Sequence, residues 1–122
     1  DFQPLNAGLD FVNKLTPYTY YWDKRTNYVN WDANPDTDLD TIEHDGTHKE
    51  DWMDIGFKAQ DVIALEKEIG HDLEDKTNLV SNRTSDGKMY QLQYEKFVPI
   101  LVKAVQELTA KVEELENKLN GE

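Results

Sequence analysis

The chain has 122 residues, and its 25 Asp and Glu against 13 Lys and Arg give a formal net charge of −12. This length suits one domain with a tail, and the acidic balance opposes binding to nucleic acid or to an anionic membrane surface. The absence of cysteine excludes disulfides, thiolate zinc sites and a cysteine nucleophile. No apolar run is long enough to span a bilayer.

Residues 1–94 are predicted to form a globular head of helices and short antiparallel strands, an α+β fold. The head begins with apolar residues at spacings of four, three and three, which predict a short amphipathic helix: Leu5, Leu9, Val12 and Leu15. Pro17 ends this helix, because proline lacks the backbone donor and clashes with the preceding turn. The aromatic and β-branched residues 18–22 predict a strand, and residues 28–31 predict a second one.

Residues 32–54 have a different character, with nine acidic residues and one lysine. We predict a protruding, solvated loop here. Residues 32–43 place oxygen-bearing side chains almost as a calcium loop does, but Thr37 stands where the sharp turn favours glycine. Gly46 separates His44 from His48 and opposes a helix that would align them for zinc. We therefore expect no metal and no other cofactor, although calcium binding by the loop stays open.

The second half of the head predicts a strand, a helix and a hairpin. Residues 53, 55 and 57 alternate as in a strand, and Val62, Leu65 and Ile69 mark a helix that Gly70 closes. Residues 79–94 predict a hairpin, whose tight turn at residues 85–88 contains the Asp-Gly pair typical of such turns.

Residues 95–122 predict a C-terminal helix whose apolar residues alternate spacings of three and four, the heptad pattern of a coiled coil. The predicted oligomerisation seam consists of Val98, Val105, Val112 and Leu119 at the a positions and Leu101, Leu108 and Leu115 at the d positions. Valine at a with leucine at d nominally favours two strands. Phe97, Val102 and Ala104 widen the apolar face near the helix start, which suits either a higher-order bundle or docking onto the head. A seam packed against its own head is the alternative to assembly.

Aromatic residues are concentrated near the first strand and the acidic loop: Tyr18, Tyr20, Tyr21, Trp22, Tyr28, Trp31 and Trp52. In a small domain such side chains usually fill the core or an interface between subunits, and we favour this interpretation. Stacking on sugars is the alternative.

Three segments, in this order, resemble one family. Residues 8–22 (GLDFVNKLTPYTYYW) look like its ALDKV-type helix followed by L-x-P-V-x-Y-x-W, and residues 55–62 (IGFKAQDV) are similar to its IGFIAQEV motif. Residues 92–108 (LQYEKFVPILVKAVQEL) resemble its L-x-Y-x-x-L-V-P-L-L-V-K-A-I-Q-E-L helix. The family is the intramolecular chaperone domain, or peptidase S74, at the C-terminus of phage tailspikes and tail fibres. The motif residues that this chain shares with it include Tyr20, Trp22, Gly56, Phe57, Gln60, Tyr94 and Gln106.

The resemblance implies a homotrimer that helps the upstream fibre region of the same polypeptide to fold and is then released by self-cleavage. It implies a place on the virion, or release into the host cytoplasm during assembly. The family's serine and lysine dyad would lie just before Asp1, so we expect the chain to be a piece of a longer polypeptide and catalytically inactive as given. Ser85 to Lys88 imitates that motif with the wrong spacing, and we assign it no catalytic role. A receptor- or glycan-binding fibre tip is the alternative function.

Overall fold

The computed structural model describes residues 1–24, 28–85, 87 and 89–121. These residues divide into two compact units, one made of residues 1–16 and 57–122 and the other of Pro17–Gly56. Helices and two small antiparallel sheets make up the fold, and the predicted α+β class is confirmed.

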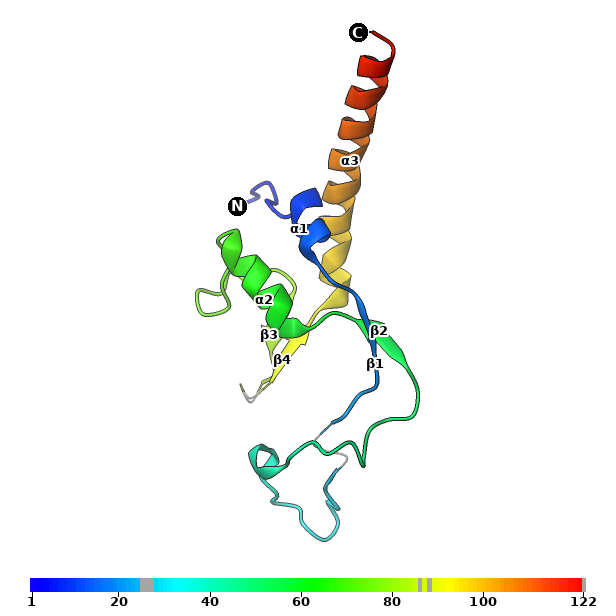
Figure 1. Ribbon diagram of the computed structural model, residues 1–122. Coiled ribbons are helices and arrows are strands. Elements are labelled where there is room, and N and C mark those ends of the chain that lie inside the picture. Colours follow the sequence, from blue (N-terminus) through cyan, green and yellow to red (C-terminus); the bar gives the residue numbers. More distant parts are fainter. Residues whose placement is uncertain (25–27, 86, 88, 122) are drawn as a thin grey trace. The chain divides into compact units, whose positions relative to one another are not determined.

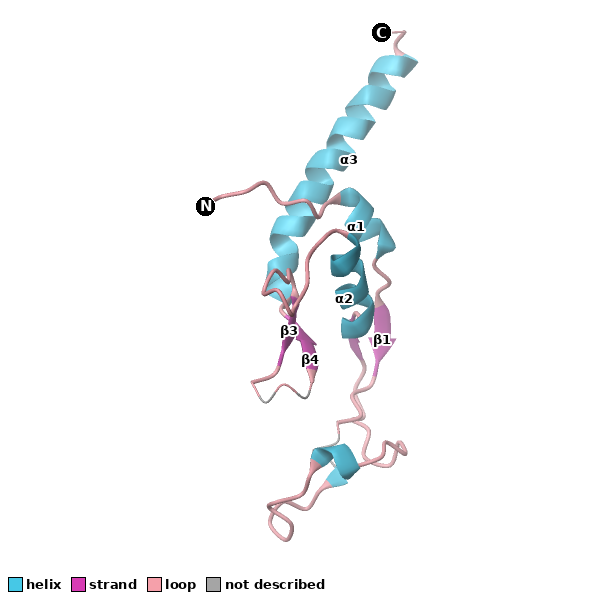
Figure 2. Ribbon diagram, turned by 90° about the vertical axis from the view of Figure 1, so that its left-hand side faces the viewer, coloured by secondary structure: helices cyan, strands magenta, loops and turns pink. Residues whose placement is uncertain are grey.

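The described residues of the first unit form three α-helices, a short 3₁₀ helix and one hairpin (Figure 1). The helices are α1 (Leu9–Lys14), α2 (Ala59–Glu68) and α3 (Phe97–Leu119), and the strands are β3 (Ser81–Arg83) and β4 (Tyr90–Leu92). β3 and β4 pair antiparallel with Asn82 opposite Gln91, which confirms the predicted hairpin (Figure 2). Asp86 and Lys88 of its predicted turn lie outside the described residues, whereas Gly87 has the positive φ of 73° expected in a tight turn.

The core of the first unit lies where α1, α2 and the start of α3 meet the hairpin. Six buried apolar residues form it: Ala7, Phe11, Val62, Val80, Phe97 and Ile100. Glu66 is 1% exposed and lies on the inner face of α2, where its Oε1 accepts a hydrogen bond from the backbone N–H of Leu79. This bond ties the segment before β3 to α2.

Three helix boundaries follow from local chemistry. Gly70 adopts φ of 90° just after α2, as predicted for its capping role, and Gly121 does the same after α3 with φ of 77°. Pro99 is the third residue of α3, where its missing N–H has no partner within the helix to lose. The short 3₁₀ helix η3 (Tyr94–Lys96) precedes α3. The predicted hairpin over residues 79–94 is therefore too long at its end, because its second strand stops at Leu92 and Tyr94 lies in η3.

The second unit is mostly irregular. Strands β1 (Tyr18–Tyr20) and β2 (Asp54–Gly56) pair antiparallel, and the 3₁₀ helix η2 (Leu39–Thr41) lies in the acidic segment between them. The predicted strand at residues 28–31 is wrong. The N–H of Asn34 instead donates to the carbonyl of Asn30 at 2.8 Å, and the side chain of Asn30 accepts from Ala33, because asparagine competes well for nearby backbone donors.

The first helix is shorter than its apolar stripe predicted, since α1 begins at Leu9 and not at Leu5. The carbonyl of Leu5 accepts a hydrogen bond from the ammonium group of Lys103 on α3. The Lys103 ammonium group thus takes the place of a helical N–H donor, and Leu5 packs on the core from the segment that precedes α1.

Candidate assembly surface

Helix α3 has two apolar faces, and they have different surroundings. Phe97, Ile100 and Ala104 are buried in the first unit, at the g and c positions of the heptad. The a and d positions point elsewhere. All seven seam residues are exposed, from 45% at Val112 to 87% at Leu119: Val98, Leu101, Val105, Leu108, Val112, Leu115 and Leu119. The seam is therefore not packed against the first unit.

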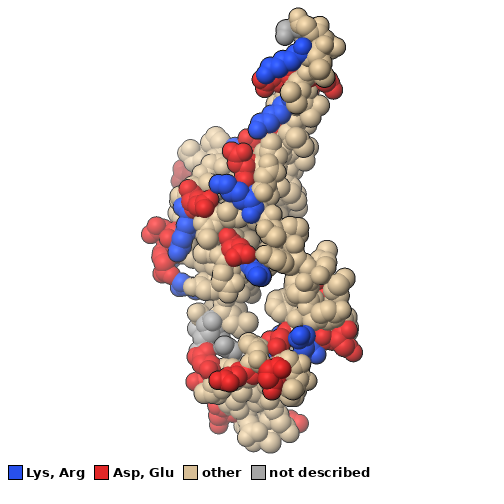
Figure 3. Space-filling model, viewed as in Figure 1, with Lys and Arg blue, Asp and Glu red and all other residues tan. Residues whose placement is uncertain are grey.

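The outer part of α3 buries none of its described side chains. Every residue from 105 to 121 is exposed, and Figure 1 shows the helix continuing well past α1 and α2. Figure 3 shows broad uncharged surface along this helix, interrupted by a few lysine and acidic side chains. Apolar residues that repeat along one side of a helix usually pack against another surface, so this stripe is the candidate assembly surface.

The widening of the apolar face near the start of α3 is explained mainly by docking onto the head. Phe97 and Ala104 are 5% exposed and belong to the face that meets the first unit. Val102 is 50% exposed and remains beside the seam at an e position. The free face is therefore the a, d and e side of the helix.

An aromatic group holds the start of α3 in place. The rings of Phe57 and Phe97 lie 5.1 Å apart, and Tyr94 lies 5.7 Å from Phe97. The backbone N–H of Phe57 donates to the hydroxyl oxygen of Tyr94 at 3.1 Å. Two motif residues, Phe57 and Tyr94, thus come together and fix the end of the helix that carries the seam.

The remaining motif residues lie in other places. Tyr20 and Trp22 meet edge to face at 5.1 Å in the second unit, where the indole N–H of Trp22 donates to Asp54 at 3.2 Å. Gly56 is buried at the end of β2. Gln60 and Gln106 are exposed on α2 and α3.

The aromatic residues of the second unit do not form a core. Trp22, Trp31 and Trp52 are 42%, 39% and 69% exposed, so the expectation of a core position is wrong for these three. A position at a subunit interface stays a prediction.

Tyr28 is the centre of a polar cluster in the second unit. Its hydroxyl donates to Asp23 at 2.5 Å and accepts from the N–H of Gly46 at 3.0 Å. The rings of His44 and His48 lie 6.0 Å and 4.5 Å from that of Tyr28. Partial burial, followed by the hydrogen bond to Asp23, raises the pKa of Tyr28 above its ordinary value.

The acidic segment presents no assembled metal site in the part of the chain that the structure describes. No group of three or more His, Asp or Glu side chains there is placed to hold an ion. Asp38, one residue of the calcium-like pattern, uses its carboxylate to cap η2 by accepting from the N–H of Asp40 at 3.0 Å.

None of the described helices is both long and apolar enough to cross a membrane.

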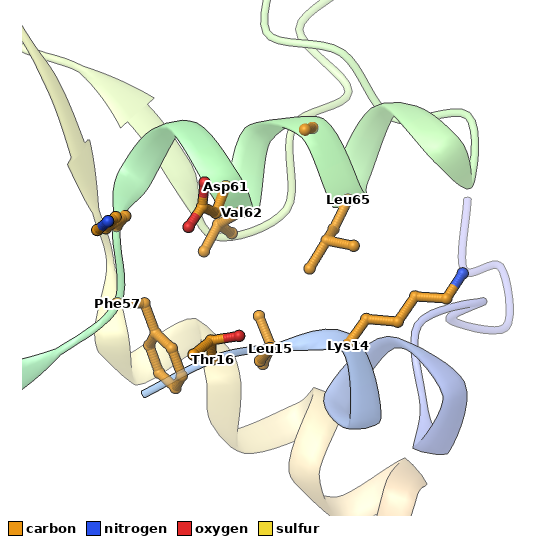
Figure 4. Close-up of a pocket in the computed structure, with 9 residues that line it drawn as sticks. Lys14, Leu15, Thr16, Phe57, Asp61, Val62 and Leu65 are labelled. Atoms are coloured by element: carbon orange, nitrogen blue, oxygen red, sulfur yellow. The ribbon is translucent and has the colours of Figure 1, made fainter. Parts of the chain in front are cut away.

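A pocket of about 210 Å³ lies between α2 and the end of α1. Figure 4 shows Leu15, Val62 and Leu65 pointing into it, whereas the ammonium group of Lys14 points away and pairs with Glu68 at 3.2 Å. The geometry offers space for an apolar side chain.

Comparison with known proteins identifies the family. A family model described as chaperone of endosialidase, peptidase S74, matches residues 1–71. This chain belongs to that family. The match covers α1, the second unit and α2, which include the first two of the three motifs, and the peptidase S74 assignment from sequence is confirmed. Searches of curated proteins and of solved structures gave no match.

Proposed function

We propose that this chain is the C-terminal intramolecular chaperone and trimerisation domain of a phage tail fibre or tailspike. Its client is the upstream fibre region of the same polypeptide. One observation supports the proposal: the a and d residues of α3 are exposed, whereas the first unit packs on a different face of that helix.

The physical argument for assembly compares the two faces of α3. The buried face already anchors the helix, so the seam is not needed to hold the head together. Leaving seven apolar side chains in water forgoes the free energy that their burial against copies of the same helix provides. Parallel α3 helices would bury the seam, and Lys111 at g could pair with Glu116 at the next e position of a neighbour.

A trimer, and not a dimer, is the proposed state. The valine and leucine pattern alone nominally favours two strands. The exposed Val102 beside the seam widens the free face towards a larger bundle, and the trimeric organisation that the family resemblance implies agrees with it. Three chain ends held together raise the effective concentration of the upstream segments, so that a fibre of high contact order begins to fold in register.

Release by autoproteolysis is part of the same proposal. The resemblance implies a serine nucleophile and a lysine base just upstream of residue 1, and a desolvated lysine can accept the proton of a serine hydroxyl. The domain then acts during assembly. It is located on the virion, or in the host cytoplasm once it has been released. A polypeptide that includes the upstream stretch should produce a new N-terminus there, and alanine at that serine should prevent it.

Sedimentation equilibrium tests the assembly directly. The expected mass is three times the 14.2 kDa of one chain, falling on dilution. Because the unpacked part of α3 depends on its copies, helix content measured by circular dichroism should fall together with the mass. A mass of 14.2 kDa throughout the dilution series would overturn the proposal.

Binding of a receptor or glycan is the second candidate, and the exposed indoles of the second unit favour it. Trp52 is 69% exposed, and Asp51 and Asp54 are close to it in sequence. An aromatic face beside carboxylates can stack on a sugar and accept its hydroxyl protons. Reproducible glycan-array signals that Trp52→Ala and Trp31→Ala abolish would support this function.

A further inference from the structure

Residues 5–9, which we name the N-terminal strap, are held to α3 through backbone atoms. The ammonium group of Lys103 donates to the carbonyl of Leu5, and Glu107 Oε1 accepts from the N–H of Leu9 at 3.0 Å. Lys103 and Glu107 are one helical turn apart, so they bind the strap near its two ends. Ala7 between these ends is fully buried.

Gly8 makes this approach possible. A Cβ atom at residue 8 would lie 1.7 Å from Glu107 Oε1 and 3.1 Å from Lys103 Cγ, so no other residue fits without displacing both side chains. Gly8 is also the N-cap of α1 and has no side chain to cap it. Glu107 provides the missing acceptor from a different helix, and its negative charge suits the N-terminal end of α1.

The opposite side of the strap is bound to the segment that follows α2. Asn6 Nδ2 donates to the carbonyl of Ile69 at 2.9 Å, and Asn6 Oδ1 lies 2.7 Å from His71 Nε2. The other ring nitrogen of His71 contacts the carbonyl of Thr77 at 2.7 Å. This side of the strap is bound to the segment after α2, whereas Glu107 belongs to the part of α3 that buries no side chain in the first unit.

We infer that Lys103 and Glu107 form a latch that couples docking of the N-terminal strap to assembly of α3. Residues 105–121 bury no side chain against the first unit, so packing of the outer helix against its copies would strengthen the helical position of Glu107. The latch contacts, which are present in the single chain, become more persistent when the helices assemble, and they then fix the point at which the upstream chain joins the domain. Coupling is reciprocal, so loss of the latch weakens assembly by the same factor, per chain, by which it loosens the strap. This inference rests on the proposed assembly function.

Hydrogen exchange at the Leu9 amide and sedimentation, measured on the same samples, test the latch. We expect exchange at Leu9 to accelerate on dilution as the assembly dissociates. Glu107→Ala should accelerate it by about threefold to tenfold in the assembled state, the effect of losing one exposed hydrogen bond to a charged acceptor. The dissociation constant, per chain, should rise by a similar factor. Gly8→Ala should act in the same direction, and Glu107→Ala keeps the test decisive where Gly8→Ala does not fold.

Glu113→Ala is the matched control, because Glu113 is exposed on the same helix and outside the seam. Glu113→Ala should change neither the exchange rate at the Leu9 amide nor the dissociation constant. An assembled chain in which Glu107→Ala speeds exchange but leaves the dissociation constant unchanged would overturn the latch and leave the assembly proposal standing. A wild-type chain that stays single at every concentration would overturn both.

Discussion

Replacing Leu108 with aspartate separates assembly from folding of the head, because Leu108 lies in the seam and outside the buried core. It is 49% exposed in the single chain. Full burial of a leucine contributes about 1.5–3 kcal/mol, so burying the remaining half contributes roughly 1 kcal/mol for each chain. Three chains together lose about 3 kcal/mol, which lowers the trimer association constant by more than a hundredfold at about 1.4 kcal/mol per tenfold.

The charge adds to this loss. Three carboxylates brought into one apolar seam lose their hydration and repel one another, so Leu108→Asp should remove the assembled species entirely. In the dissociated chain the same aspartate faces water, and the thermal transition of the head should stay close to that of the dissociated wild type.

Ala110→Asp is the matched control, since Ala110 is exposed on the same helix at an f position, away from the seam. Aspartate lowers helix propensity at least as much there as at residue 108, so the two variants differ chiefly in position. Light scattering should show Leu108→Asp as a single chain and Ala110→Asp at the wild-type mass. An unchanged mass for Leu108→Asp would refute the seam, and equal dispersal by both variants would show that the added aspartate, and not its position, is responsible.

Three other perturbations test the two units. Deleting residues 36–45 should leave the thermal transition of the first unit unchanged in calorimetry, because the segment belongs to the second unit; a large shift would contradict this. Glu66→Ala should destabilise the first unit by about 2–4 kcal/mol in denaturant titration, since it leaves a cavity and the unpaired N–H of Leu79, whereas Glu66→Gln keeps the acceptor and should cost less. Burial, followed by the hydrogen bond to Asp23, raises the pKa of Tyr28, so folding favours the neutral phenol; the stability this provides is present below the ordinary phenol pKa and is lost as pH rises through the raised value. Ultraviolet titration should show a late phenol step that Tyr28→Phe removes, and equal curves for both proteins would contradict the assignment.

The longest periodic segments were the ones that sequence predicted best. α2 and α3 have apolar residues that repeat over many turns and glycines that end them, so local and long-range preferences agree. Short segments were less predictable. Residues 5–8 carry a helical stripe, but Lys103, distant in sequence, competes for the Leu5 carbonyl. Residues 28–31 have strand-forming side chains, but Asn30 captures nearby backbone donors.

The residues of the candidate seam could be chosen from sequence, but their partner could not. Helix α3 has one apolar face that includes Ile100 at c and another that consists of the seam at a and d. Hydrophobicity alone does not say which of the two faces meets the head. The latch was missed, although a signal was present. Lys103 and Glu107 lie within the family-like helix motif. They are charged residues one turn apart and outside the seam, a pattern that indicates polar contacts with another segment.

The three-residue pairing of β1 with β2 has a consequence for how this domain can vary. Tyr18 lies opposite Gly56 in the β1–β2 pair, so the two ends of the second unit are neighbours. The chain between the two strands is a loop that this pairing closes. The entropic cost of closing such a loop grows only slowly with the length of the loop. Segments of quite different size and composition can therefore be carried at this point on the same strand pair, which makes it a natural place to insert a fluorescent reporter or a foreign epitope.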